Sequence, residues 1–178
     1  MIEDSDEQDI ALAAAGNEPA FCRILDRNGP RVLSYVRRMM GQSPDVEDIF
    51  QDTFLRFWST IDQFDPAKAS LPAWLHRIAH NLCIDAFRRQ RPREDVDRLE
   101  DRSHGPAEHY VLSERSKAVH HALERLPERQ RSAIVLCHYQ HFSNRDAAEV
   151  LEISVDALES LLRRGRKNLK QQLAEKMK

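Results

Sequence analysis

The chain has 178 residues and a formal net charge of −2 at pH 7, with 41% hydrophobic and 31% charged residues. At about 100–200 residues per domain, this length allows one domain or two small ones. The three cysteines argue against a disulfide framework, and the longest stretch without a charged residue, 132–144, is much shorter than a membrane span. The acidic start of the sequence does not resemble a signal peptide, so we expect a cytoplasmic protein.

Charge is distributed along the chain in blocks of alternating sign. The net charge is −6 over residues 1–20, −5 over 44–66, +5 over 67–93 and +6 over 163–178. Such blocks predict separate faces for partners of opposite charge, although solvated helix faces give the same pattern.

The strongest helical pattern lies at 44–61. Its apolar residues recur at i, i+3, i+4 and i+7 from Val46 to Ile61. Ser43 is suited to the N-cap and Pro44 to the first helical position. We therefore predict an amphipathic helix over this range.

Two further helices are predicted in the first half of the chain. Apolar residues at helical spacing indicate one helix over 71–89 and another over 19–40. The latter is expected to be interrupted at 27–30, because the sequence Arg-Asn-Gly-Pro favours a turn. No segment has a convincing strand pattern.

The helical pattern stops between residues 91 and 110. This stretch is polar and contains Pro92, Gly105 and Pro106, which is typical of a linker. Helical spacing resumes after it. We therefore predict an all-α fold of two small helical domains, 1–90 and 111–178, joined by a flexible linker over 91–110.

The most specific local pattern lies in residues 143–169. Ser143 and Asp146 resemble a capping box, and Ser154 can cap a second helix. The apolar spacing is that of a helix-turn-helix, although Glu152 stands where the turn often has glycine. The second helix carries the basic residues Arg163, Arg164, Arg166 and Lys167. Such a helix suits the DNA major groove; the alternative is a helical hairpin with a basic tail.

The helix predicted over 44–61 has an acidic outer face opposite its apolar stripe. The members of this face are Asp48, Gln51, Asp52 and Leu55. Acidic side chains beside an exposed leucine predict a docking surface for a basic protein, with a merely solvated face as the alternative.

The helix predicted over 71–89 has a basic outer face with aromatic residues nearby. The polar members are Arg77, His80, Asn81, Arg88 and Arg89, and the aromatic ones are Phe64, Trp74 and Phe87. This combination can follow a phosphate backbone and stack unpaired bases, and the loop 62–70 could accept a flipped base. Trp74 at this spacing can also belong to the core.

Four segments, in this order, resemble one known family. The sequences DVEDIFQDTFLRFW (45–58) and AWLHRIAHNLCIDAFRR (73–89) are similar to the first conserved domain of the group IV, or extracytoplasmic-function (ECF), sigma factors of bacterial RNA polymerase. The sequence LPERQRSAIVL (126–136) and the helix-turn-helix at 143–169 resemble their second domain.

The resemblance implies two helical domains, called σ2 and σ4, and a function in promoter-specific transcription initiation. It implies binding to the β′ clamp and the β subunit of core polymerase, and the residues that would meet the β′ clamp are Asp45, Asp48, Gln51, Asp52 and Leu55. It implies recognition and opening of the −10 element by Phe64, Trp74, Asn81, Asp85, Arg88 and Arg89. It implies recognition of the −35 element by Ser154, Ala157, Glu159, Ser160, Arg163 and Arg164. Family members are usually held inactive by an anti-sigma factor, often the cytoplasmic part of a membrane protein.

The second helix of the helix-turn-helix departs from the common family pattern. Residues 156–166 read DALESLLRRGR, where the family usually resembles GTVKSRLSRAR, so Glu159 and Leu161 replace a basic pair. Glu159 could instead accept a hydrogen bond from cytosine N4. The run SVDALESLL from Ser154 is similar to a metal-resistance branch of the family, that of cobalt–nickel resistance.

Three other functions are open to consideration. A metal sensor would use residues with ligand-like spacing, namely Cys137, His138, His141, His76 and His80. Buried cysteine and interfacial histidines account for these residues, so we expect neither a metal nor a cofactor. A stand-alone helix-turn-helix regulator would leave the acidic helix unused. An enzyme is disfavoured, because no phosphate-binding glycine loop, nucleophile motif or pair of catalytic carboxylates stands out.

Overall fold

A computed structural model describes residues 3–90 and 114–176, and these residues contain helices and no strand, which confirms the all-α fold. The first module consists of α1 (Glu3–Ala14), α2 (Glu18–Met40), α3 (Val46–Thr60), η1 (Ile61–Gln63) and α4 (Leu71–Gln90). The second consists of α5 (Glu114–Glu124), α6 (Glu128–Ile134), η3 (Val135–Tyr139), α7 (Asn144–Val150) and α8 (Val155–Lys176). The predicted linker, 91–110, lies outside the described residues.

The first module is built around the long helix α2. Asn17 caps this helix, because its Oδ1 accepts a hydrogen bond from Ala20 N at 2.9 Å. The sequence pattern did not predict α1, which packs along α2 through Asp9; its carboxylate lies 2.6 Å from Arg23 Nη2 and 2.7 Å from Arg27 Nη2. The hydrogen bond from Arg23, assisted by Arg27, lowers the pKa of Asp9 although burial opposes this shift. Part of the acidic N-terminal block therefore fastens α1 to the bundle.

The predicted break in α2 at residues 27–30 is wrong. The helix continues through Pro30. Gly29 is buried against α3, where a Cβ added to it would lie 3.5 Å from Phe50 Cζ, and the Asn28 side chain donates a hydrogen bond to the carbonyl one turn earlier, at 3.0 Å. Packing against α3 thus outweighs the local preference of Asn-Gly-Pro for a turn.

The helix α3 begins two residues later than predicted. Its N-cap position is Asp45, and Ser43 Oγ accepts a hydrogen bond from Asp45 N at 3.3 Å in the preceding turn. The predicted apolar stripe is confirmed as the inner face: its buried members are Val46, Ile49, Thr53, Phe54 and Phe57.

The second module contains the predicted helix-turn-helix. Ser143 Oγ accepts from Asp146 N at 3.1 Å and donates to Asp146 Oδ2 at 2.7 Å. Ser154 Oγ accepts from the backbone N–H three residues later at 3.2 Å, so both predicted caps are confirmed. The turn places Glu152 at φ 54°, the left-handed conformation that favours glycine. α6 continues into the π-helical turn η3 before the chain reverses into α7.

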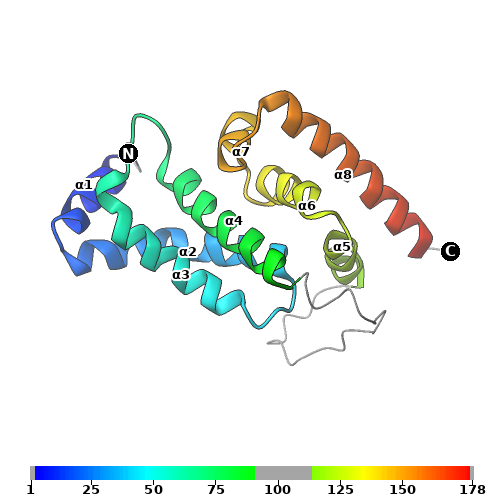
Figure 1. Cartoon of the computed structure of the whole chain (residues 1–178), viewed down its shortest axis with the longest axis horizontal. Helices are drawn as coiled ribbons and strands as arrows, with labels where there is room; N and C mark the ends of the chain where they lie inside the picture. Colours follow the sequence, from blue (N-terminus) through cyan, green and yellow to red (C-terminus); the bar gives the residue numbers. More distant parts are fainter. Residues whose placement is uncertain (1–2, 91–113, 177–178) are drawn as a thin grey trace.

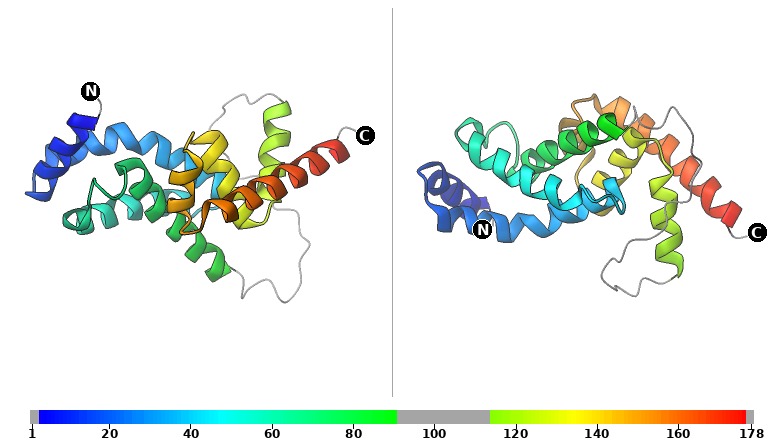
Figure 2. Two further views of the ribbon diagram at one scale, coloured as in Figure 1. Left: turned by 90° about the horizontal axis from the view of Figure 1, so that it is seen from above. Right: turned by 60° about the horizontal axis from the view of Figure 1, so that its bottom comes forward.

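The two modules pack against each other (Figure 1). α4 lies beside α7, and α2 contacts α5, α6 and η3; the views in Figure 2 show the same arrangement. One cluster of buried apolar residues runs from Ile24 of α2 through Leu75 of α4 to Leu136 and Leu158 of the second module. The described parts of the chain therefore share a common hydrophobic core.

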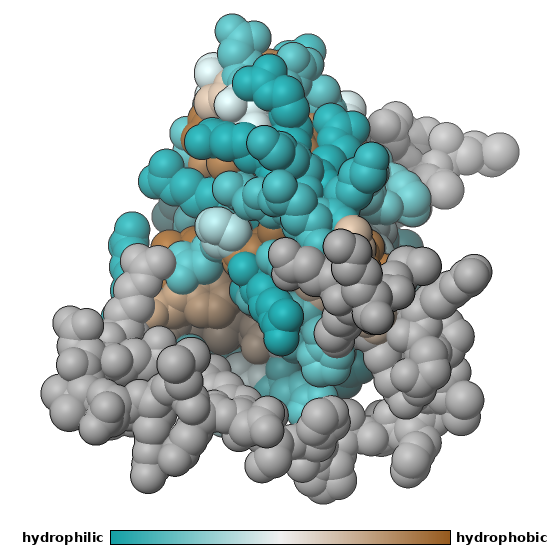
Figure 3. Space-filling view, turned by 90° about the vertical axis from the view of Figure 1, so that its right-hand side faces the viewer, coloured by the Kyte–Doolittle hydropathy of each residue, from teal (hydrophilic) through white to brown (hydrophobic). Residues whose placement is uncertain are grey.

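The end of the molecule formed by α5 and the C-terminal part of α8 is largely hydrophilic where it is described, and apolar side chains lie recessed between the helices (Figure 3). None of the helices within the described ranges is long and apolar enough to cross a membrane. The exposed large hydrophobic residues of these ranges are Leu12, Leu55 and Val155. Of these, Leu55 is the most exposed, at 64%.

Candidate nucleic-acid interface

The outer face of α3 presents its acidic residues to solvent. Asp48, Gln51, Asp52 and Leu55 are all exposed, and their i, i+3, i+4, i+7 spacing puts them on one side of the helix. Asp45 differs from them, because it is half-buried and accepts a hydrogen bond from Gln90 Nε2 of α4 at 3.2 Å. The structure thus groups four of the five predicted docking residues and gives the fifth a contact within the module.

The C-terminal half of α4 presents the polar residues predicted to read DNA. Asn81, Asp85, Arg88 and Arg89 are exposed. Arg88 Nη1 lies 3.7 Å from Asp85 Oδ1, so part of its charge is balanced by its neighbour on the helix. Exposed pairs of this kind contribute about 0–1 kcal/mol, which leaves Arg88 able to exchange the carboxylate for a phosphate.

Phe64 and Trp74 form an aromatic pair at the start of α4. Their ring centroids lie 5.7 Å apart at an interplanar angle of 84°, and both side chains are half-buried. The preceding loop is stabilised by Asp65, whose carboxylate accepts from Lys68 and from Ala67 N, each at 3.0 Å. Trp74 is therefore partly a core residue, as its spacing allowed.

The N-terminal half of α8 presents the residues predicted to enter the −35 groove. Ser154, Ala157, Glu159, Arg163 and Arg164 are exposed and Ser160 is half-buried. The opposite side of the helix is apolar: Leu158 is fully buried and Leu162 is 4% exposed. The helix-turn-helix therefore holds its second helix with the polar side outward, which is the orientation that a recognition helix requires.

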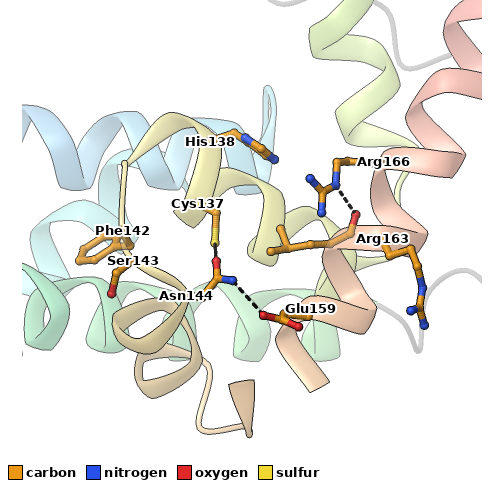
Figure 4. Close-up of a pocket in the computed structure, with 9 residues that line it drawn as sticks. Cys137, His138, Phe142, Ser143, Asn144, Glu159, Arg163 and Arg166 are labelled. Carbon is orange, nitrogen blue, oxygen red and sulfur yellow. Dashed lines mark hydrogen bonds between the residues drawn. The ribbon is translucent and has the colours of Figure 1, made fainter. Parts of the chain in front are cut away.

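A cleft of about 540 Å³ lies between η3, the start of α7 and α8 (Figure 4). Asn144 Nδ2 donates to Glu159 Oε1 at 3.4 Å across it, and Arg163 and Arg166 also line it. Glu159 therefore has a partner within the motif, which fixes its carboxylate beside the basic residues of α8.

The candidate metal ligands of the sequence are divided between the interior and the surface, where His138 and His141 are exposed. His76 and His80 are buried on α4, and burial lowers the pKa of each to about 4. Burial raises the pKa of Cys83 to about 12 and also raises the pKa of Cys137, so these thiols stay protonated near neutral pH. Within the described ranges, no three His, Cys, Asp or Glu side chains are grouped as a metal site would require.

Two family models match the chain in the order of its modules. The model named Sigma-70 region 2 matches residues 24–93, and the model named Sigma-70, region 4 matches residues 116–169. The ECF RNA polymerase sigma factor SigW of Bacillus subtilis is 30% identical, over 93% of this chain and 95% of SigW. The chain belongs to the ECF sigma factors. The first module is thus its σ2 domain and the second its σ4 domain.

Other relatives of this ECF sigma factor are similar along their whole length. RNA polymerase sigma factor CnrH of Cupriavidus metallidurans is 33% identical, over 94% of this chain and 93% of CnrH. The solved structure of CnrH in complex with the cytosolic domain of CnrY has a TM-score of 0.71 at 30% identity and covers 96% of this chain and 98% of CnrH. The sigma factor RpoE of Bartonella quintana, solved with the anti-sigma factor NepR, has a TM-score of 0.73 at 27% identity and covers 86% of this chain and 96% of RpoE.

One residue that is central to the packing of this ECF sigma factor was not predicted to have a role. Arg131 is 8% exposed, and its guanidinium donates to the carbonyls of Met39, Glu124 and Leu126. Its position in the sequence could have indicated this role, because Arg131 shares a helix face with the apolar Ile134 three residues later. A charged residue on an apolar face needs internal hydrogen-bond partners, and here backbone carbonyls supply them.

Proposed function

We propose that this ECF sigma factor binds core RNA polymerase through the exposed face of α3 and directs initiation at its own promoters. The observation that carries this proposal is the grouping of Asp48, Gln51, Asp52 and Leu55 on a solvent-exposed face within a σ2 domain. Carboxylates on such a face steer a basic partner surface into contact, and the leucine supplies an apolar anchor. The partner is the β′ clamp, with the β subunit as a further contact.

The two DNA elements are assigned to two different helices. Asn81, Asp85, Arg88 and Arg89 of α4, with the Phe64 and Trp74 pair, recognise and open the −10 element. The polar side of α8 reads the −35 element, with Glu159 held by Asn144 close to the bases. An aromatic pair beside a basic helix is suited to unstacked bases, and a basic second helix after a tight turn is suited to duplex DNA.

Control of this sigma factor is assigned to an anti-sigma factor. The similar structures of CnrH and RpoE were solved in complex with the cytosolic domain of CnrY and with NepR, respectively. This supports a partner of the same kind for the present chain, acting in the cytoplasm. The similarity to CnrH and to NccH of Alcaligenes xylosoxydans, which is 34% identical over 92% of both chains, supports the metal-resistance branch.

Reversing the charges of Asp48 and Asp52 should weaken binding to core polymerase. Asp48→Arg with Asp52→Arg turns attraction for a basic surface into repulsion, so we expect the affinity to fall about tenfold or more, chiefly through a slower association rate. The measurement is a binding titration of labelled sigma factor with core polymerase. Because both side chains are exposed, helical circular dichroism should stay at the wild-type level.

The matched control reverses two exposed acidic residues of α2, Glu18→Arg with Asp26→Arg. It changes the net charge by the same amount and should leave the affinity within about twofold of wild type. Equal affinities for wild type and the α3 variant would remove the proposed docking face.

Arg163 and Arg164 should contribute differently at the −35 element. They point about 100° apart around the helix, and Arg164 Nε donates back to Ser160 O at 3.3 Å. Replacing an arginine that neutralises a phosphate by Ala should weaken binding to all promoters and reduce the salt slope by roughly one. Replacing one that reads guanine should cost about 1–3 kcal/mol at one base pair only.

Run-off transcription by holoenzyme across a salt series separates these two effects. Lys170→Ala, at an exposed position nearly two turns further along α8, is the control that should transcribe like wild type. If Arg163→Ala and Arg164→Ala both match wild type at every salt concentration, the assigned orientation of α8 is wrong.

A further inference from the structure

We infer that Asn144 of α7 is a positioning residue for promoter recognition: it holds the Glu159 carboxylate away from Arg163 and leaves one carboxylate oxygen for a cytosine of the −35 element. The group recognised is the N4 amino group of that cytosine in the major groove of duplex DNA. The inference rests on the function proposed for α8. It adds a specificity-determining contact from the first helix of the helix-turn-helix and the base that this contact selects.

The contact joins the two helices of the helix-turn-helix at their exposed side. Asn144 is the first residue of α7, and Glu159 lies five residues after the Ser154 cap of α8. Asn144 Nδ2 donates to Glu159 Oε1 at 3.4 Å, across 15 residues of sequence. Both residues are exposed. The hydrogen bond therefore fixes the direction of the Glu159 side chain without belonging to the hydrophobic core.

A thiol on the other side of Asn144 orients its amide group. Cys137 Sγ donates to Asn144 Oδ1 at 3.9 Å, and Figure 4 shows Asn144 between Cys137 and Glu159. Burial raises the pKa of Cys137, so its thiol keeps the proton that it donates. Turning the amide by half a rotation would place Oδ1 against the carboxylate, and two acceptors would then face each other. The thiol and the carboxylate thus favour the same orientation of the amide.

The hydrogen bond from Asn144 competes with an ion pair within α8. Glu159 precedes Arg163 by four residues, and this spacing and order favour an ion pair on a helix. Within residues 3–90 and 114–176, however, the hydrogen bond of Glu159 goes to Asn144 and no ion pair joins Glu159 to Arg163. Figure 4 shows Arg163 directed away from Glu159. Arg163 therefore keeps its guanidinium available for DNA.

The second carboxylate oxygen of Glu159 determines which base is accepted. Glu159 Oε2 has no hydrogen-bond partner in the part of the chain that the structure describes. DNA phosphates repel a carboxylate, so Glu159 favours binding only where a base donates to it. In the major groove, cytosine N4 and adenine N6 are such donors, but adenine also presents the N7 acceptor beside N6. A carboxylate without a proton thus selects cytosine.

A promoter library transcribed by holoenzyme tests this inference. The library carries all four bases at each position of the −35 element in a promoter that the holoenzyme transcribes, and sequencing of the transcribed templates gives the preference at each position. We expect the wild type to prefer cytosine about tenfold at one position, and Glu159→Ala to lose this preference. Asn144→Ala should reduce it to about twofold at the same position, with the other positions unchanged.

Two double variants separate positioning from a merely structural function. In Asn144→Ala, Glu159 is free to pair with Arg163, so total transcription from the library should fall about twofold. Adding Glu159→Ala should recover the total without recovering the cytosine preference. Asn144→Asp with Glu159→Gln exchanges donor and acceptor between the two positions. This variant should regain a preference at the same position, because the amide nitrogen is held and the amide oxygen remains for the base.

The matched control is Asn168→Ala. Asn168 Nδ2 donates to Gln130 Oε1 at 2.8 Å, so this asparagine also joins α8 to another helix of σ4, and the variant should keep the wild-type profile. An unchanged cytosine preference in Asn144→Ala, an equal loss at all positions, or no recovery of the total on adding Glu159→Ala would overturn the positioning function. If Arg163→Ala still alters the profile in those cases, the function proposed for α8 stands; if no variant of α8 alters it, both are wrong.

Discussion

Leu158→Asp is expected to unfold the helix-turn-helix and abolish −35-dependent transcription. Leu158 is fully buried where α8 packs on the rest of σ4. The substitution removes its apolar contacts, which alone costs about 2–5 kcal/mol, and it places an unpaired carboxylate in the core. Because domain stabilities are about 5–15 kcal/mol, we expect a loss of σ4 helicity by circular dichroism at 25 °C.

Two neighbouring changes distinguish burial from loss of DNA contact. Leu158→Met conserves volume and should cost less than about 1.5 kcal/mol. Ala157→Asp introduces the same carboxylate one residue earlier, at an exposed position, and should keep the helical signal while affecting DNA binding. A Leu158→Asp chain that melts like wild type would show that this side chain does not belong to the core.

Arg131→Ala is expected to lower the free energy of unfolding by about 2–4 kcal/mol, because carbonyls at the ends of two helices lose their donor and the side-chain stem leaves a gap. The guanidinium donates to the carbonyls of Met39 and Glu124, and to that of Leu126 at 3.3 Å. It also lies 5.7 Å from the centroid of the Phe87 ring. Urea denaturation followed by circular dichroism measures the loss.

Arg131→Lys should recover only part of this stability, since a lysine keeps the charge but lacks the planar fork that reaches several carbonyls. The control is Arg129→Ala, at an exposed position two residues earlier on α6, which should stay within about 0.5 kcal/mol of wild type. If Arg131→Ala and Arg129→Ala have the same denaturation midpoint, the carbonyls are satisfied in another way.

The buried face of α4 explains why two of the candidate metal ligands of the sequence, His76 and His80, have a structural function. Tyr35 Oη lies 3.0 Å from His80 Nδ1, and His76 Nδ1 donates to Pro72 O at 2.7 Å. Both histidines are buried, and burial lowers the pKa of each to about 4. They are therefore neutral near pH 7, which suits an apolar interface better than imidazolium would.

Local sequence determined the inner face of α3 and the two helix caps of the helix-turn-helix. The apolar period that starts at Val46 defined the inner face of α3, and with it the exposed position of Asp48 and Leu55. The serine caps at Ser143 and Ser154 were readable because a cap joins residues only three apart. These features depend on spacing and side-chain chemistry within one or two turns, so the local pattern was enough to predict them.

Tertiary structure alone decided which local preferences were overridden and how the two domains meet. α2 runs through Pro30 because Gly29 packs on Phe50. Helix propensity is a local quantity and does not include the free energy of this contact with α3. The hydrogen bond from Arg131 to Met39 joins residues 92 positions apart. The apolar periodicity of α2 and that of α6 do not show how the two helices align with each other. The face that each helix buries follows from its own periodicity, whereas its partner is selected by the free energy of packing the whole chain.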